Sequence, residues 1–290
     1  MKFFLPEIYH DQRGFEALIY LQEQTKDCFL ENIEVDLSTT NWFDADMCAA
    51  FGAILCRISD DMNTVRLINI HDDVAKILSK NGFLSHYGRE KIPDLLGTTI
   101  PYSRFDIKDD RFFADYIESE LMQRSEIPVM SHGLLKKFRE NIFEIFSNAV
   151  LHSQTKLGIF SCGQFFFRRH QLDFSVADLG VGIRQNILEN TGLDLAPEDA
   201  IVWATEERNT TKRGQIPGGL GLKLLREFID LNGGRIQIVS DAGYLLREDS
   251  KTVTARLSRP FPGTVVRIQI NTADTRSYAL SSELSETDIF

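Results

Sequence analysis

Hydrophobic and polar residues alternate in a regular way along the first part of the chain. Residues 32–37 alternate one by one, as in a half-buried β-strand, and residues 45–59 repeat apolar side chains at helical spacing. A second strand is predicted over residues 64–70, followed by a helix over 73–81 that ends at Gly82. This succession of elements predicts a small α/β unit.

The next stretch, residues 93–110, has no sustained periodicity. It contains glycine, proline and a run of charged residues, a composition typical of a linker. We therefore expect a first domain over residues 1–100, a linker over residues 101–111 and a second domain over residues 112–271. The remaining residues, 272–290, are polar and acidic and are expected to be disordered.

The predicted second domain also alternates between helices and strands. One long stretch within it, residues 208–217, is too polar for a core and is expected to form a mobile loop. The predicted helices cover residues 112–124, 134–152, 184–190, 197–207 and 221–232. The predicted strands cover residues 157–161, 164–178, 235–240, 243–247, 252–257 and 264–270, with a turn near residues 168–170.

Composition narrows the class of protein. The 290 residues are enough for two domains with cores of their own, and 43% of them are hydrophobic, as in an ordinary globular protein. No apolar run reaches the length of a membrane span, and Pro6 and Glu7 interrupt the apolar start, so we expect a soluble, cytoplasmic protein. The net charge of −10 argues against unspecific binding to nucleic acid or to an anionic membrane, and it favours a protein or a small molecule as partner.

The four cysteines give no sign of a metal site. Cys28, Cys48, Cys56 and Cys162 lack CxxC spacing and have no histidine cluster close by in the sequence. We expect them to be buried thiols rather than metal ligands or members of a disulfide framework.

A first candidate for chemistry is a pair of polar residues in the helix predicted over 134–152. Glu144 and Asn148 are four residues apart, so their side chains lie on one helix face and can contact the same ligand. The amide oxygen of Asn148 suits Mg²⁺, which prefers oxygen ligands and shares its shell with phosphates, while Glu144 could orient or deprotonate a nucleophile. The alternative is that both residues are ordinary exposed helix positions.

A second candidate is the acidic glycine turn Asp178-Leu-Gly180-Val-Gly182-Ile183, which follows an apolar strand. Two glycines permit a tight turn and allow a planar group to approach the main chain closely. A carboxylate at Asp178 can accept a hydrogen bond from an exocyclic amine, a contact that selects adenine over guanine. The alternative is a plain strand-to-helix turn, in which the aspartate caps the helix and the glycines allow the bend.

A third candidate is the glycine-rich segment of residues 218–222, at the start of the helix predicted over 221–232. Free amide groups and the positive end of the helix dipole attract phosphate there, and glycines let phosphate oxygens reach those amides. Lys212 and Arg213, just upstream, could neutralise a terminal phosphate. The alternatives are a flexible hinge and two solvated basic side chains.

Together the three motifs resemble the N, G1 and G2 boxes of the GHKL family, which is named after gyrase, a heat-shock chaperone, histidine kinases and mismatch-repair ATPases. The resemblance covers residues 112–271 and implies a Bergerat-type two-layer α/β sandwich with a mixed, mostly antiparallel sheet, which binds ATP and Mg²⁺. It implies that Asn148 binds Mg²⁺, that Asp178 contacts the adenine amine and that Glu144 is a candidate general base. The other residues implied in nucleotide binding are Gly180, Gly182 and Ile183 near adenine, Thr264 beside Asp178, and Lys212, Arg213, Gly218, Gly219, Leu220, Gly221 and Leu222 around the phosphates.

Within that family, the segment Asn148-Ala-Val-Leu-His152-Ser is most similar to the anti-sigma-factor serine kinases of bacteria. The first domain resembles, through residues 35–46 and 65–83, the STAS domain of anti-sigma-factor antagonists. Those antagonists accept phosphate on a serine, whereas this chain has Ala45 and Asp46 there, so we expect a fixed docking role without a phosphate acceptor. The alternative for Asp46 is an acidic residue that stabilises an ordinary helix start.

The residues and the resemblance together predict an Mg-ATP-binding regulatory protein. The first hypothesis is slow ATP hydrolysis with Glu144 as base. Hydrolysis would be coupled to closure of the loop over 208–217 and to control of a partner. Phosphorylation of a protein serine or threonine is the second, and nucleotide-dependent binding without turnover is the third. The expected cofactors are ATP and Mg²⁺. The expected partners are ATP, a regulatory protein and, as an alternative, a second copy of the chain, but neither a specific nucleic acid nor a membrane.

Overall fold

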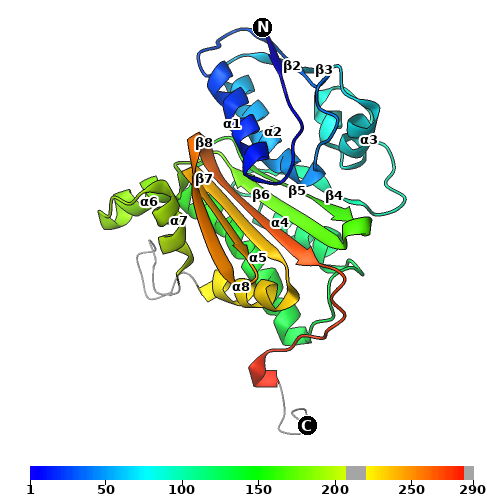
Figure 1. Cartoon of the computed structure of the whole chain (residues 1–290), viewed down its shortest axis with the longest axis vertical. Coiled ribbons are helices and arrows are strands. Elements are labelled where there is room, and N and C mark those ends of the chain that lie inside the picture. The colour runs from blue at the N-terminus through cyan, green and yellow to red at the C-terminus, as the bar shows by residue number, and fades with distance from the viewer. Residues whose placement is uncertain (207–219, 284–290) are drawn as a thin grey trace.

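The N-terminal part of the chain forms a three-stranded parallel sheet with the strand order β1-β2-β3. A computed structural model describes residues 1–206 and 220–283, and Figure 1 shows how its elements are arranged. The strands are β1 (Lys2–Phe4), β2 (Asn32–Asp36) and β3 (Thr64–Ile68), and the helices that alternate with them are α1 (Gln12–Thr25), α2 (Cys48–Asp60) and α3 (Asp72–Lys80).

Helices α1 and α2 lie between this sheet and a second one (Figure 1). Connections between parallel neighbours are right-handed as a rule, so strands that follow one another in order place both connecting helices on the same face. Side chains of that face share one buried core with a face of the second sheet, and this core includes Phe15, Phe51, Phe160 and Phe261. The N-terminal unit is therefore packed against the rest of the chain.

The second sheet has five strands in the order β4-β5-β6-β8-β7, and all four pairings are antiparallel. The predicted fold class is confirmed: the chain is an α/β protein in which a small α/β unit precedes an antiparallel sheet packed with helices. The strands are β4 (Thr99–Phe105), β5 (Ile159–Phe166), β6 (Gln171–Asp178), β7 (Arg235–Glu248) and β8 (Lys251–Asn271).

Other helices cover the opposite face of the five-stranded sheet. Their apolar side chains form a second core with the sheet, in which Phe113, Phe138, Phe174 and Phe228 are buried. Two further helices follow β6 and pack beside β7. The covering helices are α4 (Asp110–Ile117), α5 (His132–His152) and α8 (Leu220–Asn232), and those beside β7 are α6 (Gly182–Thr191) and α7 (Pro197–Thr205).

The first two turns of helix α2 are buried on all sides because both sheets contact the helix. Every residue from Cys48 to Leu55 is buried, and small side chains allow close contact with both layers. At Gly52 a side chain is excluded, since an added Cβ would lie 2.2 Å from the hydroxyl oxygen of Tyr102. Such an all-round apolar helix is typical of a protein interior. Across residues 1–206 and 220–283, no helix combines the length and the apolar character needed to cross a bilayer.

Four strands differ from the prediction. The stretch predicted as a linker contains β4, which pairs on one side only, so Pro101 is tolerated in this edge strand. The four C-terminal strands predicted after α8 are two long strands, because the irregularity near Asp241 shifts the register without ending β7. The turn between β7 and β8 lies at Asp249 and Ser250, both with positive φ. The elements β1 and α1 were not predicted at all.

Residues 272–283 are ordered, in contrast to the expected disordered tail. Tyr278 pairs with Met130 in an isolated bridge, and its ring lies 5.2 Å from that of Phe228 in α8. The carboxylate of Glu283 accepts hydrogen bonds from the Ser131 hydroxyl and, at 2.9 Å, from the Gly133 amide. Aromatic packing and a cap on the first turn of α5 thus hold this segment in place.

Candidate functional site

Asp178, at the end of β6, has a carboxylate that its own turn fixes in position. The residue is only 5% exposed, and Oδ1 accepts a hydrogen bond of 2.9 Å from the Gly180 amide. Within the sheet it pairs in register with Thr264 of β8, the residue that the resemblance implied beside Asp178 in the adenine site. The role of the Thr264 hydroxyl there stays a prediction. The carboxylate therefore has a defined direction before any ligand binds.

The environment of Asp178 favours the protonated carboxyl. Burial raises its pKa to about 7, although hydrogen bonds with Gly180, Ser153 and Thr264 oppose the shift. A hydrogen-bond donor that approached the second oxygen would stabilise the ionised form and lower the pKa again. The site is therefore suited to a ligand that donates a hydrogen bond.

Gly180 packs directly against the end of α5. An added Cβ would lie 2.0 Å from the carbonyl oxygen of Ser153, so only glycine fits. The neighbouring amide of Val181 donates a hydrogen bond of 2.7 Å to the same carbonyl oxygen, and the Ser153 hydroxyl donates to the carbonyl of Ala149. The glycine turn is thus joined to the last turn of α5, which carries Asn148.

Ser240 of β7, outside all three motifs, connects the turn to the sheet. Its Oγ accepts a hydrogen bond of 2.8 Å from the Ile183 amide and lies 2.9 Å from Oγ1 of Thr264. Gly182, the first residue of α6, has a φ of +76°, in the left-handed region that favours glycine. Sequence reasoning missed Ser240, because a single serine in a strand has no recognisable motif around it.

Glu144 and Asn148 both lie on α5 and are partly exposed. The buried face of the helix carries Ile145 and Ala149 instead, which belong to the core under the sheet. The pair therefore lies beside the core, one helical turn apart, with Asn148 closer to the glycine turn. This is the relative placement that the helical spacing predicts.

The third motif is described only from Leu220 onward, where α8 begins. Helix α8 lies beside α5 on the same face of the sheet, and the rings of Phe138 and Phe228 are 5.2 Å apart. The helix that carries the first motif therefore contacts the second motif through Ser153, and the helix that follows the third motif packs beside it. The first turn of α8 is formed by Leu220, Gly221 and Leu222. Outside the described residues lie the predicted loop of residues 208–217, which includes Lys212 and Arg213, and the glycines Gly218 and Gly219.

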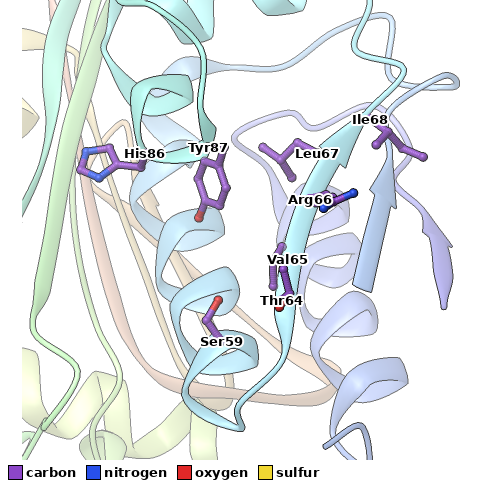
Figure 2. Close-up of a pocket in the computed structure, with 8 residues that line it drawn as sticks. All are labelled: Ser59, Thr64, Val65, Arg66, Leu67, Ile68, His86 and Tyr87. Carbon is purple, nitrogen blue, oxygen red and sulfur yellow. The ribbon is translucent and has the colours of Figure 1, made fainter. Parts of the chain in front are cut away.

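A pocket of about 530 Å³ lies elsewhere, in the N-terminal unit between α2, β3 and the short helix Phe83–Tyr87 (Figure 2). Apolar and polar side chains are mixed along its wall, among them Leu67, Arg66 and His86. The eight residues that line it include none of the predicted nucleotide-binding residues. The pocket therefore does not bear on the predicted site.

Asp46, which with Ala45 stands where the antagonists carry their acceptor serine, is fully buried between the N-terminal unit and the five-stranded sheet. Arg267 of β8 donates one hydrogen bond to Asp46, with Nε 2.7 Å from Oδ2, and another to Asp173 of β6, with Nη2 2.6 Å from Oδ1. The imidazole of His10 lies against the same two carboxylates. Sequence reasoning missed this group because its members are far apart along the chain.

No protein-family model matches the chain, and no curated protein matches it significantly. Its function is therefore inferred from its own residues and their geometry.

Proposed function

We propose that the chain binds Mg-ATP at the turn between β6 and α6, next to the ends of α5 and α8. The observation that carries the proposal is the buried carboxylate of Asp178, which the Gly180 amide holds next to Thr264. An amine that donates to this carboxylate would form a charge-assisted hydrogen bond in a water-poor place. Adenine carries an exocyclic amine on ring carbon C6, whereas guanine carries a carbonyl oxygen on that carbon.

Two side chains near the end of α5 suit the proposed chemistry, one as a ligand of Mg²⁺ and the other as a general base. Asn148 would hold the ion through its amide oxygen, and phosphates and water would complete its shell. When bound, Mg²⁺ neutralises charge on the phosphates. Glu144, one turn earlier on the same helix, would accept a proton from an attacking water molecule, which gives slow ATP hydrolysis as the proposed reaction.

The N-terminal unit supports a regulatory role, because it is packed on the sheet that carries Asp178. The Ala45 amide donates to Oε1 of Gln164 at 2.5 Å, and the Ala49 amide donates to Sγ of Cys162 at 3.1 Å. Both acceptors belong to β5, two strands from β8. This arrangement fits a cytoplasmic regulator in which nucleotide binding at one end of the sheet affects a protein partner.

Binding is tested by calorimetry with a non-hydrolysable ATP analogue and Mg²⁺. Asp178→Asn should weaken binding by about tenfold or more, since a hydrogen bond to a charged group contributes about 1.5–3 kcal/mol. Asp194→Asn is the matched control, because Asp194 is an exposed aspartate near α6. Equal affinity of the wild type and Asp178→Asn would refute the adenine contact, and absence of any binding would refute the proposed function.

Turnover is tested by following radiolabelled phosphate. Free phosphate from the wild type indicates hydrolysis, label on a partner protein indicates a kinase, and label that stays in ATP indicates binding alone. Glu144→Ala should abolish release of phosphate while it retains affinity for ATP. Glu140→Ala, in an exposed ion pair with Lys137 on the same helix, should behave as wild type. Continued release from Glu144→Ala would show that another group is the base.

A further inference from the structure

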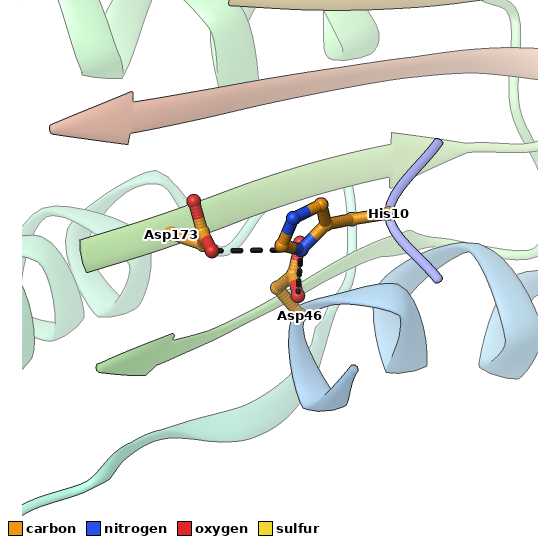
Figure 3. A group of neighbouring side chains, drawn as sticks. All are labelled: His10, Asp46 and Asp173. Atoms are coloured by element: carbon orange, nitrogen blue, oxygen red, sulfur yellow. Dashed lines mark ion pairs between the residues drawn. The ribbon is translucent and has the colours of Figure 1, made fainter. Parts of the chain in front are cut away.

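Three side chains from distant parts of the chain converge at the boundary between the N-terminal unit and the five-stranded sheet. His10 follows β1, Asp46 lies in the short 3-10 helix Ala45–Met47 before α2, and Asp173 belongs to β6. Figure 3 shows that the imidazole and the two carboxylates point toward one another. We call His10, Asp46 and Asp173 the interface triad.

The distances within the interface triad match a small metal site. Nδ1 of His10 lies 3.5 Å from Oδ1 of Asp46 and 3.6 Å from Oδ2 of Asp173, and one ligand atom of each residue lies within 4.8 Å of the others. Ligand atoms that each lie about 2.1 Å from a tetrahedral metal ion are about 3.4 Å apart. The two distances to Nδ1 are already close to this value, and the separation of the two carboxylate oxygens, which is within 4.8 Å, would have to match it for one ion to bind all three atoms.

The converging atoms are those without a hydrogen-bond partner. In the described part of the chain, Nδ1 of His10, Oδ1 of Asp46 and Oδ2 of Asp173 make no hydrogen bond, although both aspartates are fully buried. Their polar neighbours are one another and Oδ2 of Asp44, which lies 3.1 Å from Nδ1 of His10. Buried polar atoms are normally satisfied, so three such atoms at one place indicate a missing partner. Because all three can donate an electron pair, a cation is a partner that fits.

The remaining contacts hold the triad in position. Arg267 binds the other oxygen of each carboxylate, at 2.7 Å for Asp46 and 2.6 Å for Asp173, and so directs the free oxygens to the shared point. The main chain of His10 is held as well, because its amide donates to Asp44 and its carbonyl accepts from Gln237. Such outer contacts orient metal ligands in known sites.

The charges around the triad are unbalanced. Asp44, Asp46 and Asp173 carry three negative charges when ionised, and Arg267 supplies one positive charge. Two negative charges remain when the His10 imidazole is neutral, the form that binds a metal ion, and one remains when it is protonated. A divalent cation would cancel this charge.

We propose that the interface triad binds a divalent transition-metal ion, with Zn²⁺ as the best fit, and that this ion links the N-terminal unit to the five-stranded sheet. One imidazole nitrogen and two carboxylate oxygens suit Zn²⁺ or its neighbours, whereas Ca²⁺ requires more oxygen ligands. The ion has a structural role, because its ligands belong to both units and lie away from Asp178. The proposal is independent of ATP binding.

The test uses the full chain, stripped with a chelator and then titrated with Zn²⁺ in the presence of excess Mg²⁺ and without nucleotide. We expect one Zn²⁺ per chain and a melting temperature several degrees higher with the metal. Co²⁺ in place of Zn²⁺ should give the visible absorption band of a low-symmetry site. Absence of bound Zn²⁺ and of a thermal shift would overturn the proposal.

His10→Ala is the informative variant, because its side chain is partly accessible and its loss leaves the Arg267 ion pairs intact. This variant should lower the affinity for Zn²⁺ at least about tenfold and remove the Co²⁺ band. His170→Ala, which changes an exposed histidine in the β5–β6 hairpin, is the matched control and should bind as wild type. Equal affinity in His10→Ala and the wild type would place the metal elsewhere and overturn the proposal.

Discussion

Arg267 of β8 donates a hydrogen bond from Nε to Oδ2 of Asp46, 2.7 Å away, although 221 residues separate the two in sequence. Both side chains are fully buried, and the same guanidinium also binds Asp173 and Gln237. A guanidinium remains charged at every pH of interest. The N-terminal unit and the five-stranded sheet are therefore joined by a permanent charge at the centre of their contact.

Replacement of Arg267 should destabilise the whole chain. Arg267→Ala leaves the carboxylates of Asp46 and Asp173 buried without their counter-ion, a change that costs about 3–5 kcal/mol in buried ion pairs. Urea unfolding in the presence of a chelator measures the loss. Arg13→Ala, which removes an exposed pair with Asp11, should leave the midpoint unchanged. An unchanged midpoint in Arg267→Ala would mean that the ion pairs do not hold the units together.

Much of the fold follows from local periodicity. The elements β2, α2, β3, α3 and α5 lie within a few residues of their predicted positions, because each has a regular apolar face. Edge strand β4 was missed since it contains Pro101 and a register shift, which interrupt the alternation. Helix α1 does carry helical spacing in Phe15, Leu18 and Ile19, a signal that the prediction left unused.

The candidate site was predictable only where motifs are local. The turn from Asp178 to Gly182 is visible in the sequence, but its contact with Ser153 depends on how α5 ends against the sheet. Likewise, the pairing of Asp178 with Thr264 depends on strand register, which a single sequence does not specify. The interface triad has no sequence signal, because long-range packing alone brings its members together.

The close contact at Gly180 should tolerate no side chain. Gly180→Ala would push the turn away from the Ser153 carbonyl, since overpacking of this kind costs about 1–3 kcal/mol and the obstacle is main chain. Gly192→Ala is the control, because Gly192 has positive φ but open space around it, so only the conformational cost of about 1 kcal/mol applies. Denaturant unfolding compares the two. Equal losses would show that the turn can shift away from α5 without cost.

Tyr278 lies beyond the predicted second domain of residues 112–271, and we expect it to stabilise the packing around α8 and the start of α5. Its ring packs on Phe228, and its amide donates a hydrogen bond of 2.9 Å to the carbonyl of Val129. Tyr278→Ala should lower the free energy of unfolding by about 1–2 kcal/mol through lost apolar contact. Leu95→Ala, at a highly exposed leucine, should have no effect. In hydrogen exchange, a Tyr278 amide as fast as that of a free peptide would contradict the ordered segment.

Protonation of Asp178 should couple stability and nucleotide binding to pH in opposite directions. Burial raises the pKa of its carboxyl to about 7 in the folded chain, above the value of 3.8 for a free aspartate. The folded state therefore binds the proton more tightly, and this contribution to stability is complete below pH 3.8 and is lost as the pH rises to about 7. Without ligand, this group makes the free energy of unfolding fall by up to about 1.4 kcal/mol for each unit by which the pH rises.

ATP should instead bind more weakly as the pH falls from 8 to 6, because the proposed contact with the adenine amine uses the ionised carboxylate of Asp178. Calorimetric titrations across this range should show a proton released from the protein on binding at pH 6 and little at pH 8. Asp178→Asn should remove this part of the pH dependence, and Asp194→Asn should retain it. The phosphates of ATP also titrate near pH 7, so adenosine, which lacks them, is the ligand that isolates the effect. If adenosine affinity proves independent of pH while Asp178→Asn still weakens binding, the carboxyl contributes to the shape of the turn and does not contact the base.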